Sequence, residues 1–339
     1  MTDRVRVLVV DDSAFARKVL REVLATSARI DVVGVARDGL EALELAARLA
    51  PDVVTLDLLM PELDGIGVLR ELPPGAPPCV VVSVSDVQSE LVVEALALGA
   101  FDFVHKPTSL ATDRLYELGG ELVAKVLAAA SSRRGPAAPE PAAVPVPQPA
   151  EPPSIVVVGT STGGPQALTR IVPALPPDLP PVVIALHIPS EYTGPMAARL
   201  GQLAGRRVIE AHDAVELGPG AVVLARGGAD LELERDGERL LARVVHRPQR
   251  PYHPSVDALF ESAARAVGSR CLGVVLTGMG DDGLAGARAI REQGGRVLVE
   301  ASSSAIVDGM PRSVRDAGLA NASVPLERLA SELGRLLNR

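Results

Sequence analysis

SIVVVGTSTGGPQAL, residues 154–168, runs from four apolar residues into a serine flanked by glycines and then into a helical pattern. The apolar run predicts a buried strand, and the spacing after Gly164 predicts the start of a helix. GTSTG fits G-x-S-x-G, a pattern that holds a nucleophilic serine on a strand-to-helix turn. A plain glycine turn and a phosphate-binding loop at a helix N-terminus fit the same letters. The role of Ser161 therefore depends on which other residues reach this turn.

The rest of the second half continues the alternation of strand and helix. Asp236-Gly237 predicts the turn of a β-hairpin. The other patterns predict strands at 182–186, 220–225 and 296–300, a strand from 271 that leads into a glycine-rich loop, and helices at 255–267 and 326–337. This order predicts an α/β domain with a mainly parallel, doubly wound sheet.

A nucleophilic serine needs a base, and the base needs an orienting acid. His187 follows the apolar run VVIAL directly, at the carboxyl end of a predicted strand, and VVLTGMGDDG brings Asp281 and Asp282 to the same edge. Alone, His187 reads as a histidine at the edge of the core, but with Ser161 and these aspartates a triad is favoured. Its order, Ser–His–Asp, differs from that of the α/β-hydrolases. Of the other histidines of this half, His212 lies in a polar stretch and His246 at the end of the hairpin, whereas His253 lies beside Pro254 before a helix and could line a cleft.

The first half reads as five strand–helix units. The predicted strands are 5–10, 30–36, 52–57, 79–85 and 101–106, each followed by a helical pattern. Continuous apolar strands of this kind are buried on both faces, so we expect a parallel, doubly wound sheet. Sites in such sheets lie at the carboxyl ends of the strands.

Polar residues gather at those ends. Asp11, Asp12 and Asp57 would bring three carboxylates together, an arrangement that calls for a hard cation such as Mg²⁺. With Mg²⁺ present, Asp57 can attack phosphorus and become an acyl phosphate. Ser83 and Lys106 could then hold the phosphoryl oxygens. Each residue alone would pass for a helix cap or a turn, but the joint placement indicates a site.

A proline-rich segment separates the halves. Residues 131–153 contain eight prolines and no apolar periodicity, which predicts an extended spacer between a domain at 1–130 and one at 154–339. The formal net charge is −8, with 14 basic and 22 acidic residues in 1–153 and 20 of each in 154–339. Neither half has the excess of basic residues that is typical of nucleic-acid-binding proteins. Two separated cysteines, no signal peptide and no membrane-length apolar run predict a cytoplasmic protein without membrane insertion.

VVDDS, LDLLMPELDG, VVVS and HKP, over residues 1–130, resemble the receiver domain of two-component response regulators. The resemblance implies a flavodoxin-like fold, a histidine kinase as phosphodonor and Asp57 as phospho-acceptor. It also implies Asp11 and Asp12 as Mg²⁺ ligands, Ser83 and Lys106 as phosphoryl contacts, and Phe103 as the aromatic switch residue.

GTSTGGP, HIPSEYTGPMAARL, HPSVDALF, LTGMGDDG and GMPRS resemble the catalytic domain of the chemotaxis protein-glutamate methylesterases. The resemblance implies a Rossmann-like α/β domain that hydrolyses glutamate γ-methyl esters on chemoreceptor helices, deamidates receptor glutamines and needs no cofactor for the esterase. It implies Ser161 as nucleophile, His187 as base and Asp282 as orienting acid. Backbone amides near Thr162 and Met279 are candidates for the oxyanion hole. We expect a monomer.

The chain departs from the family pattern at three places. Leu59 stands where a glutamate is usual, which bears on phosphorylation kinetics. Tyr252 occupies the place where the family commonly has a histidine, and His253 stands one place later. VSD follows Ser83, where small polar residues are usual. The alternative to an enzyme is a response regulator whose output domain binds a nucleotide or partner. A DNA-binding output is disfavoured because no helix-turn-helix pattern is found.

Overall fold

The computed structural model describes residues 4–84, 89–106, 112–132, 151–246 and 250–337. The chain divides into two compact units, 1–135 and 136–339, and the division falls inside the proline-rich segment. Of that segment, residues 133–150 lie outside the described residues. Among the described residues, no helix is long and apolar enough to cross a membrane. Each unit is described by itself below.

The first unit is a five-stranded parallel sheet in the order β2-β1-β3-β4-β5. Its strands are β1 (Val5–Val10), β2 (Ile30–Ala36), β3 (Val53–Leu56), β4 (Cys79–Val84) and β5 (Asp102–Lys106). The helices are α1 (Ala14–Ala25), α2 (Gly39–Leu49), α3 (Gly65–Glu71), α4 (Ser89–Ala97) and α5 (Thr112–Ser132). The helix α1 packs against α5, and α3 packs against α2 and α4.

This arrangement follows from the sequence patterns. β1 and β3 are almost wholly buried, as their continuous apolar runs predict. Side chains of Ser13, Asp38 and Asp64 accept hydrogen bonds from backbone amides at the starts of α1, α2 and α3, which satisfies donors that a helix leaves free. Because β1 and β3 are neighbours, the residues that follow them meet at one edge of the sheet.

The second unit contains a seven-stranded, all-parallel sheet in the order β15-β14-β13-β6-β7-β10-β8. Its strands are β6 (Ile155–Thr160), β7 (Val182–Leu186), β8 (Val208–Ala211), β10 (Val222–Ala225), β13 (Cys271–Val275), β14 (Arg296–Glu300) and β15 (Ala322–Val324). A separate antiparallel sheet, β11-β12-β9, holds the predicted hairpin. It consists of β11 (Asp230–Asp236), β12 (Arg239–Val245) and β9 (Val215–Glu216).

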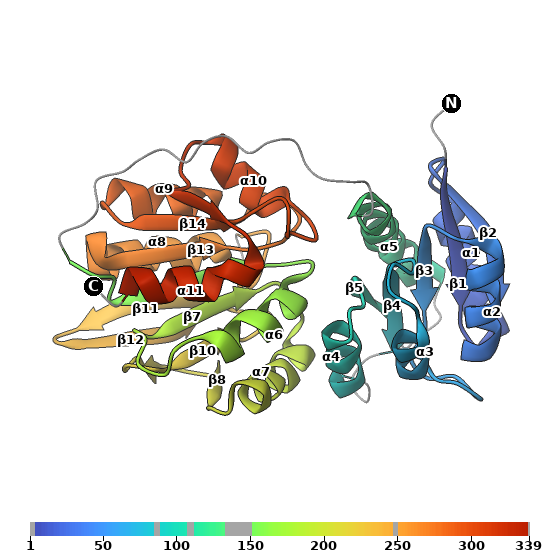
Figure 1. Cartoon of the computed structure of the whole chain (residues 1–339), viewed down its shortest axis with the longest axis horizontal. Helices are drawn as coiled ribbons and strands as arrows, with labels where there is room; N and C mark the ends of the chain where they lie inside the picture. Colours follow the sequence, from blue (N-terminus) through green and yellow to red (C-terminus); the bar gives the residue numbers. More distant parts are fainter. Residues whose placement is uncertain (1–3, 85–88, 107–111, 133–150, 247–249, 338–339) are drawn as a thin grey trace. The chain divides into compact units, whose positions relative to one another are not determined.

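Helices cover the large sheet in two groups (Figure 1). The helix α6 (Gly164–Ala174) packs against α7 (Ser190–Ala204) and α11 (Leu326–Leu337). The helix α8 (Val256–Val267) packs against α9 (Leu284–Glu292) and the hairpin strand β11, and α10 (Gly309–Asp316) packs against α9. A short 3-10 helix, Gly268–Arg270, joins α8 to β13. The prediction of a mainly parallel α/β fold with a hairpin is therefore confirmed.

Strand β6 is central because β13 and β7 lie on either side of it. Gly159, near its carboxyl end, lets α8 approach closely, because a Cβ there would lie 2.1 Å from Cγ1 of Val256. The start of α8 thus packs directly beside the strand that leads to Ser161.

Each unit has one cysteine in its sheet. Cys79 begins β4 and Cys271 begins β13, and both are buried with free thiols. Burial raises the pKa of each thiol to about 12, so both remain protonated, as the sequence predicted for reduced core cysteines.

Candidate active site

Ser161 lies on the turn between β6 and α6. Its amide donates to the carbonyl of Thr277 at 3.1 Å, and its carbonyl accepts from the amide of Gly164 at 2.7 Å. Gly163, two residues further along the turn, has a φ of +79°, a left-handed conformation that suits glycine. The turn is therefore fixed from both sides, by the loop after β13 and by the first turn of α6.

His187 follows β7, the neighbour of β6. Its amide donates to the carbonyl of Thr160 at 3.1 Å, and its side chain lies 2.9 Å from Asp282, between Nε2 and Oδ2. Because Asp282 is a carboxylate, this bond assigns the hydrogen to Nε2 and leaves Nδ1 as the basic nitrogen. Within the described chain the Ser161 hydroxyl has no hydrogen-bond partner, so only the backbone of Ser161 is bonded to the loop after β13.

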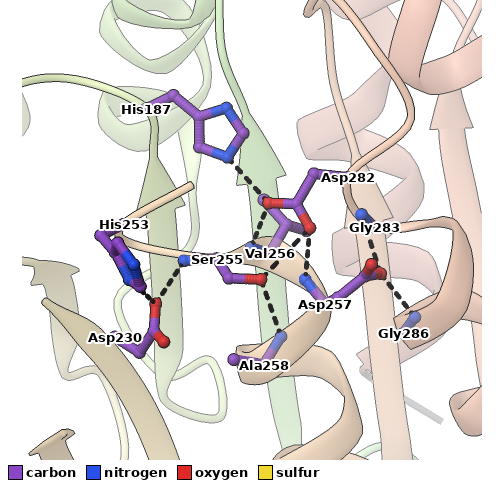
Figure 2. Close-up of polar contacts among 10 residues, drawn as sticks. All are labelled: His187, Asp230, His253, Ser255, Val256, Asp257, Ala258, Asp282, Gly283 and Gly286. Carbon is purple, nitrogen blue, oxygen red and sulfur yellow. Dashed lines mark hydrogen bonds and ion pairs between the residues drawn. The ribbon is translucent and has the colours of Figure 1, made fainter. Parts of the chain in front are cut away.

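Asp282 accepts hydrogen bonds from four donors (Figure 2). Beside His187 these are the amides of Val256 at 2.7 Å and Asp257 at 2.9 Å, and the hydroxyl of Ser255 at 3.3 Å. Burial alone would raise the pKa of Asp282, but the bonds from His187 and the two amides lower it below its ordinary value. The carboxylate is thus held ionised, the state that can orient and stabilise an imidazolium.

Asp257 connects the same two helices in the opposite direction, from α8 to α9. It lies in the first turn of α8, and its Oδ1 accepts from the amides of Gly283 at 2.9 Å and Gly286 at 2.7 Å, at the start of α9. Burial raises the pKa of Asp257 to about 6, and the nearby charge of Asp282 acts in the same direction. Sequence reasoning missed Asp257, whose position in a first helical turn looks ordinary.

The loop after β13 lies close to Ser161. A Cβ on Gly278 would lie 2.9 Å from that of Ser161, so only glycine fits at this approach. Thr277 ties the loop together, because its hydroxyl donates to the carbonyl of Thr162 at 2.9 Å and accepts from the amide of Val307 at 2.9 Å. Among the described residues the amide of Met279 has no hydrogen-bond partner, which leaves it available to a developing oxyanion.

The other sequence candidates of this unit have other partners or lie at the surface. Asp281 is exposed, whereas Asp282 is buried. His253 pairs with the buried Asp230 at 3.1 Å, and His212 lies 3.1 Å from Glu210. His246 is exposed at the end of β12. Of the residues that the departures from the family pattern singled out, Tyr252 does reach the pair, because its ring stacks on that of His187.

The first unit brings together the predicted carboxylates and the lysine. Oxygens of Asp11, Asp12 and Asp57 lie within 4.8 Å of one another. Lys106 Nζ lies 2.5 Å from Asp11 Oδ2 and 2.9 Å from Asp57 Oδ2, and Asp57 Oδ1 accepts from the amide of Leu58 at 2.8 Å. Burial raises the pKa of Asp57, although Lys106 acts in the opposite direction. Three converging carboxylates fit a hard dication that prefers oxygen ligands.

Ser83 and Phe103 lie on the neighbouring strands β4 and β5, and both are buried. Lys125 reaches over Phe103, with Nζ 5.3 Å from the ring centroid and 2.6 Å from the Phe103 carbonyl oxygen. Leu59, where the family usually has a glutamate, is half exposed. Of VSD, the side chain of Val84 and all of Ser85 and Asp86 lie outside the described residues, as does Pro107.

Residues 156–333 match the family model described as CheB methylesterase, and residues 7–117 match the response regulator receiver domain. The chain is 60% identical over 343 residues to protein-glutamate methylesterase/protein-glutamine glutaminase 5 of Myxococcus xanthus, covering 98% of this chain and 97% of that one. Protein-glutamate methylesterase/protein-glutamine glutaminase of Geobacillus kaustophilus is 41% identical, and the match covers 98% of this chain and 99% of that one.

Among solved structures, the Thermotoga maritima CheB methylesterase catalytic domain is 35% identical, with a TM-score of 0.53, and the match covers 54% of this chain and 98% of that one. The family match spans more than half of the chain and includes the elements that carry Ser161, His187 and Asp282. The chain therefore belongs to the CheB methylesterase family and carries a response regulator receiver domain in its first half.

Proposed function

We propose that the chain hydrolyses glutamate γ-methyl esters on chemoreceptor helices, deamidates receptor glutamines, and is controlled by phosphorylation of Asp57. The observation that carries the catalytic part is the 2.9 Å bond between His187 Nε2 and Asp282 Oδ2 beside Ser161. The names of the relatives support the two substrates. The alternative of a non-enzymatic output domain gives no reason for an oriented imidazole beside a glycine-flanked serine.

In the proposed reaction, Ser161 Oγ attacks the ester carbonyl while His187 Nδ1 takes its proton. His187 then returns that proton to the departing methoxide, which leaves as methanol. Water, deprotonated by the same nitrogen, attacks the acyl-enzyme; the bond to Ser161 Oγ breaks, His187 returns the proton to Oγ, and the glutamate carboxylate is freed. With glutamine as substrate, the leaving group is ammonia. The amides of Met279 and Thr162 are our candidates for the oxyanion contacts, each worth about 3 kcal/mol of barrier.

In the receiver, the geometry supports Asp57 as phospho-acceptor with Asp11 and Asp12 beside it as ligands of Mg²⁺. Bound Mg²⁺ would neutralise charge on the phosphoryl oxygens during transfer. Asp57 supplies the attacking oxygen, and Lys106, already within 2.9 Å of Asp57, would hold a phosphoryl oxygen. Ser83 and Phe103 are proposed to respond to the new charge.

For the partners, we propose a histidine kinase of the chemotaxis type as phosphodonor and methylated receptor helices as substrate. We propose that the chain meets these helices in the cytoplasm. It would act as a monomer and bind no nucleic acid. Control is proposed to be steric, with the unphosphorylated receiver hindering access of the receptor to Ser161.

The test is release of methanol from methylated receptor, measured for the intact chain with and without a phosphodonor. We expect Ser161-dependent release that rises on phosphorylation. A fluorophosphonate probe should label the wild type and not Ser161→Ala. An unlabelled serine together with no methanol would favour the non-enzymatic alternative.

A further inference from the structure

Tyr252 covers one face of the imidazole of His187. The two rings are nearly parallel, with an interplanar angle of 10° and centroids 4.6 Å apart. The hydroxyl end of Tyr252 reaches the loop after β13, where a Cβ on Gly280 would lie 3.4 Å from it. Tyr252 thus spans from the proposed base to the loop beside Ser161, although 40% of its surface is exposed.

The chain around Tyr252 is held by specific bonds. Asp230, buried at the start of β11, accepts from the amide of Ser255 at 2.8 Å and lies 3.1 Å from Nδ1 of His253 (Figure 2). The carbonyl of His253 accepts from the amide of Gly228 at 3.1 Å. Gly228 and Asp230, at the start of β11, therefore fix the segment that follows Tyr252, so the exposed ring is placed before any substrate arrives.

The stacking acts on the one group that must gain a charge. When His187 takes the proton of Ser161 it becomes an imidazolium, and the face of an aromatic ring attracts a cation. The stack also limits rotation of the imidazole about its bond to Asp282. The charged group bonded to the imidazole is Asp282, from the loop before α9, and Asp257 on α8 donates its backbone amide to that carboxylate.

The geometry points to Tyr252 as a positioning residue that stabilises the protonated form of His187 and fixes the plane of its imidazole. This role rests on the function proposed above for Ser161 and His187, and it deepens that function by adding a residue outside the triad. The positioning role comes from the aromatic ring of Tyr252 and not from its hydroxyl.

Titration of the histidine ring protons by NMR tests the proposal without substrate. The chain has five histidines, and comparison with His187→Gln identifies the signal of His187. In Tyr252→Leu we expect that signal to titrate about half a pH unit lower than in the wild type, because a cation–π contact is lost. Tyr252→Phe is the matched control and should titrate like the wild type.

Kinetics on methylated receptor supply the second measurement. Tyr252→Leu should lower kcat by about three- to tenfold with KM within twofold, while Tyr252→Phe retains activity. A raised KM with unchanged kcat and titration would make Tyr252 a substrate contact and overturn the proposal. The proposal would also be overturned if Tyr252→Leu lost stability while kcat and the His187 titration stayed unchanged. A shifted titration without esterase activity in the wild type would instead reject the proposed function and keep the stacking effect.

Discussion

The carboxylates of Asp282 and Asp257 each cap the helix that begins beside the other residue. Asp282, which precedes α9, accepts from the first amides of α8, and Asp257, in the first turn of α8, accepts from Gly283 and Gly286 at the start of α9. Free amides and the helix dipole favour negative charge at both places. These bonds fix the Asp282 carboxylate, which orients His187, to the start of α8. The rigidity of the site therefore comes from the two helix ends.

The first prediction concerns the charge of Asp257. Its folded pKa of about 6 lies above the ordinary 3.8, so the folded protein binds this proton more tightly than the unfolded chain does. Its contribution to stability is therefore present below about pH 4 and is lost as the pH rises through about 6. Asp257→Asn keeps an acceptor oxygen for the two amides and removes the titration.

We expect the unfolding free energy of Asp257→Asn to vary less between pH 4.5 and pH 7 than that of the wild type. Because Asp257 is partly exposed, the difference should be on the order of 1–2 kcal/mol. Urea unfolding of the fragment 154–339 at the two pH values measures it. Equal pH dependence in both proteins would show that the titration of Asp257 does not contribute.

The second prediction concerns the triad as a unit. Ser161→Ala and His187→Ala should each remove most methanol release, and the double variant should be little worse than either single one, because neither residue works without the other. Rates on methylated receptor, with circular dichroism to verify folding, provide the comparison. If the losses multiply, the two side chains do not act on the same step.

The third prediction separates Asp282 from its neighbours in the triad. Asp282→Asn puts an NH₂ donor where four donors already converge, so it should lower both activity and stability, the latter by about 1–3 kcal/mol. Ser161→Ala, at a hydroxyl without a partner in the described chain, should lower activity alone. Thermal unfolding beside the assay distinguishes them. An Asp282→Asn variant as stable as Ser161→Ala would argue against the helix-end role.

The fourth prediction concerns phosphorylation. Transfer from acetyl phosphate should need Mg²⁺ and should vanish in Asp57→Ala, because Asp57 supplies the attacking oxygen. Asp31→Ala, an exposed aspartate of β2, is the matched control and should be labelled normally. Hydroxylamine, which cleaves acyl phosphates, should remove the label. Label that resists hydroxylamine, or that persists in Asp57→Ala, would identify another acceptor.

The fifth prediction concerns control by the receiver. If the receiver hinders access to Ser161, the fragment 154–339 should release methanol faster than the unphosphorylated whole chain. A tenfold shift in the ratio of closed to open states needs only about 1.4 kcal/mol, which one altered contact can supply. Equal rates for the two, together with acceleration of the intact chain by phosphorylation, would mean that the receiver activates.

The sequence predicts the residues that follow strands better than those that depend on helices. His187 and Asp282 are predictable neighbours because parallel strands end at a common edge of the sheet. Asp11, Asp57 and Lys106 meet for the same reason. Such placements need only strand patterns and a parallel sheet, and continuous apolar runs give both.

Asp257 and Tyr252 depend on packing that no local pattern contains. The partners of Asp257 lie at the start of α9, 26 and 29 residues further along the chain. Tyr252 reaches His187 because the distant Asp230 holds the segment. No element was predicted for α7 either, where Gly194, Pro195 and Gly201 oppose helix formation. There the buried Tyr192, Met196 and Leu200 compensate through tertiary contacts.

Each half of the molecule contains one buried free cysteine, which can report the unfolding of that half. Cys79 and Cys271 are both buried in sheets, one in each unit, and the chain has no tryptophan for fluorescence. A thiol reagent reaches either sulfur only when the surrounding sheet opens. Timed alkylation followed by peptide mass analysis would therefore read the opening of the receiver and of the esterase separately, within one intact chain and without an added label.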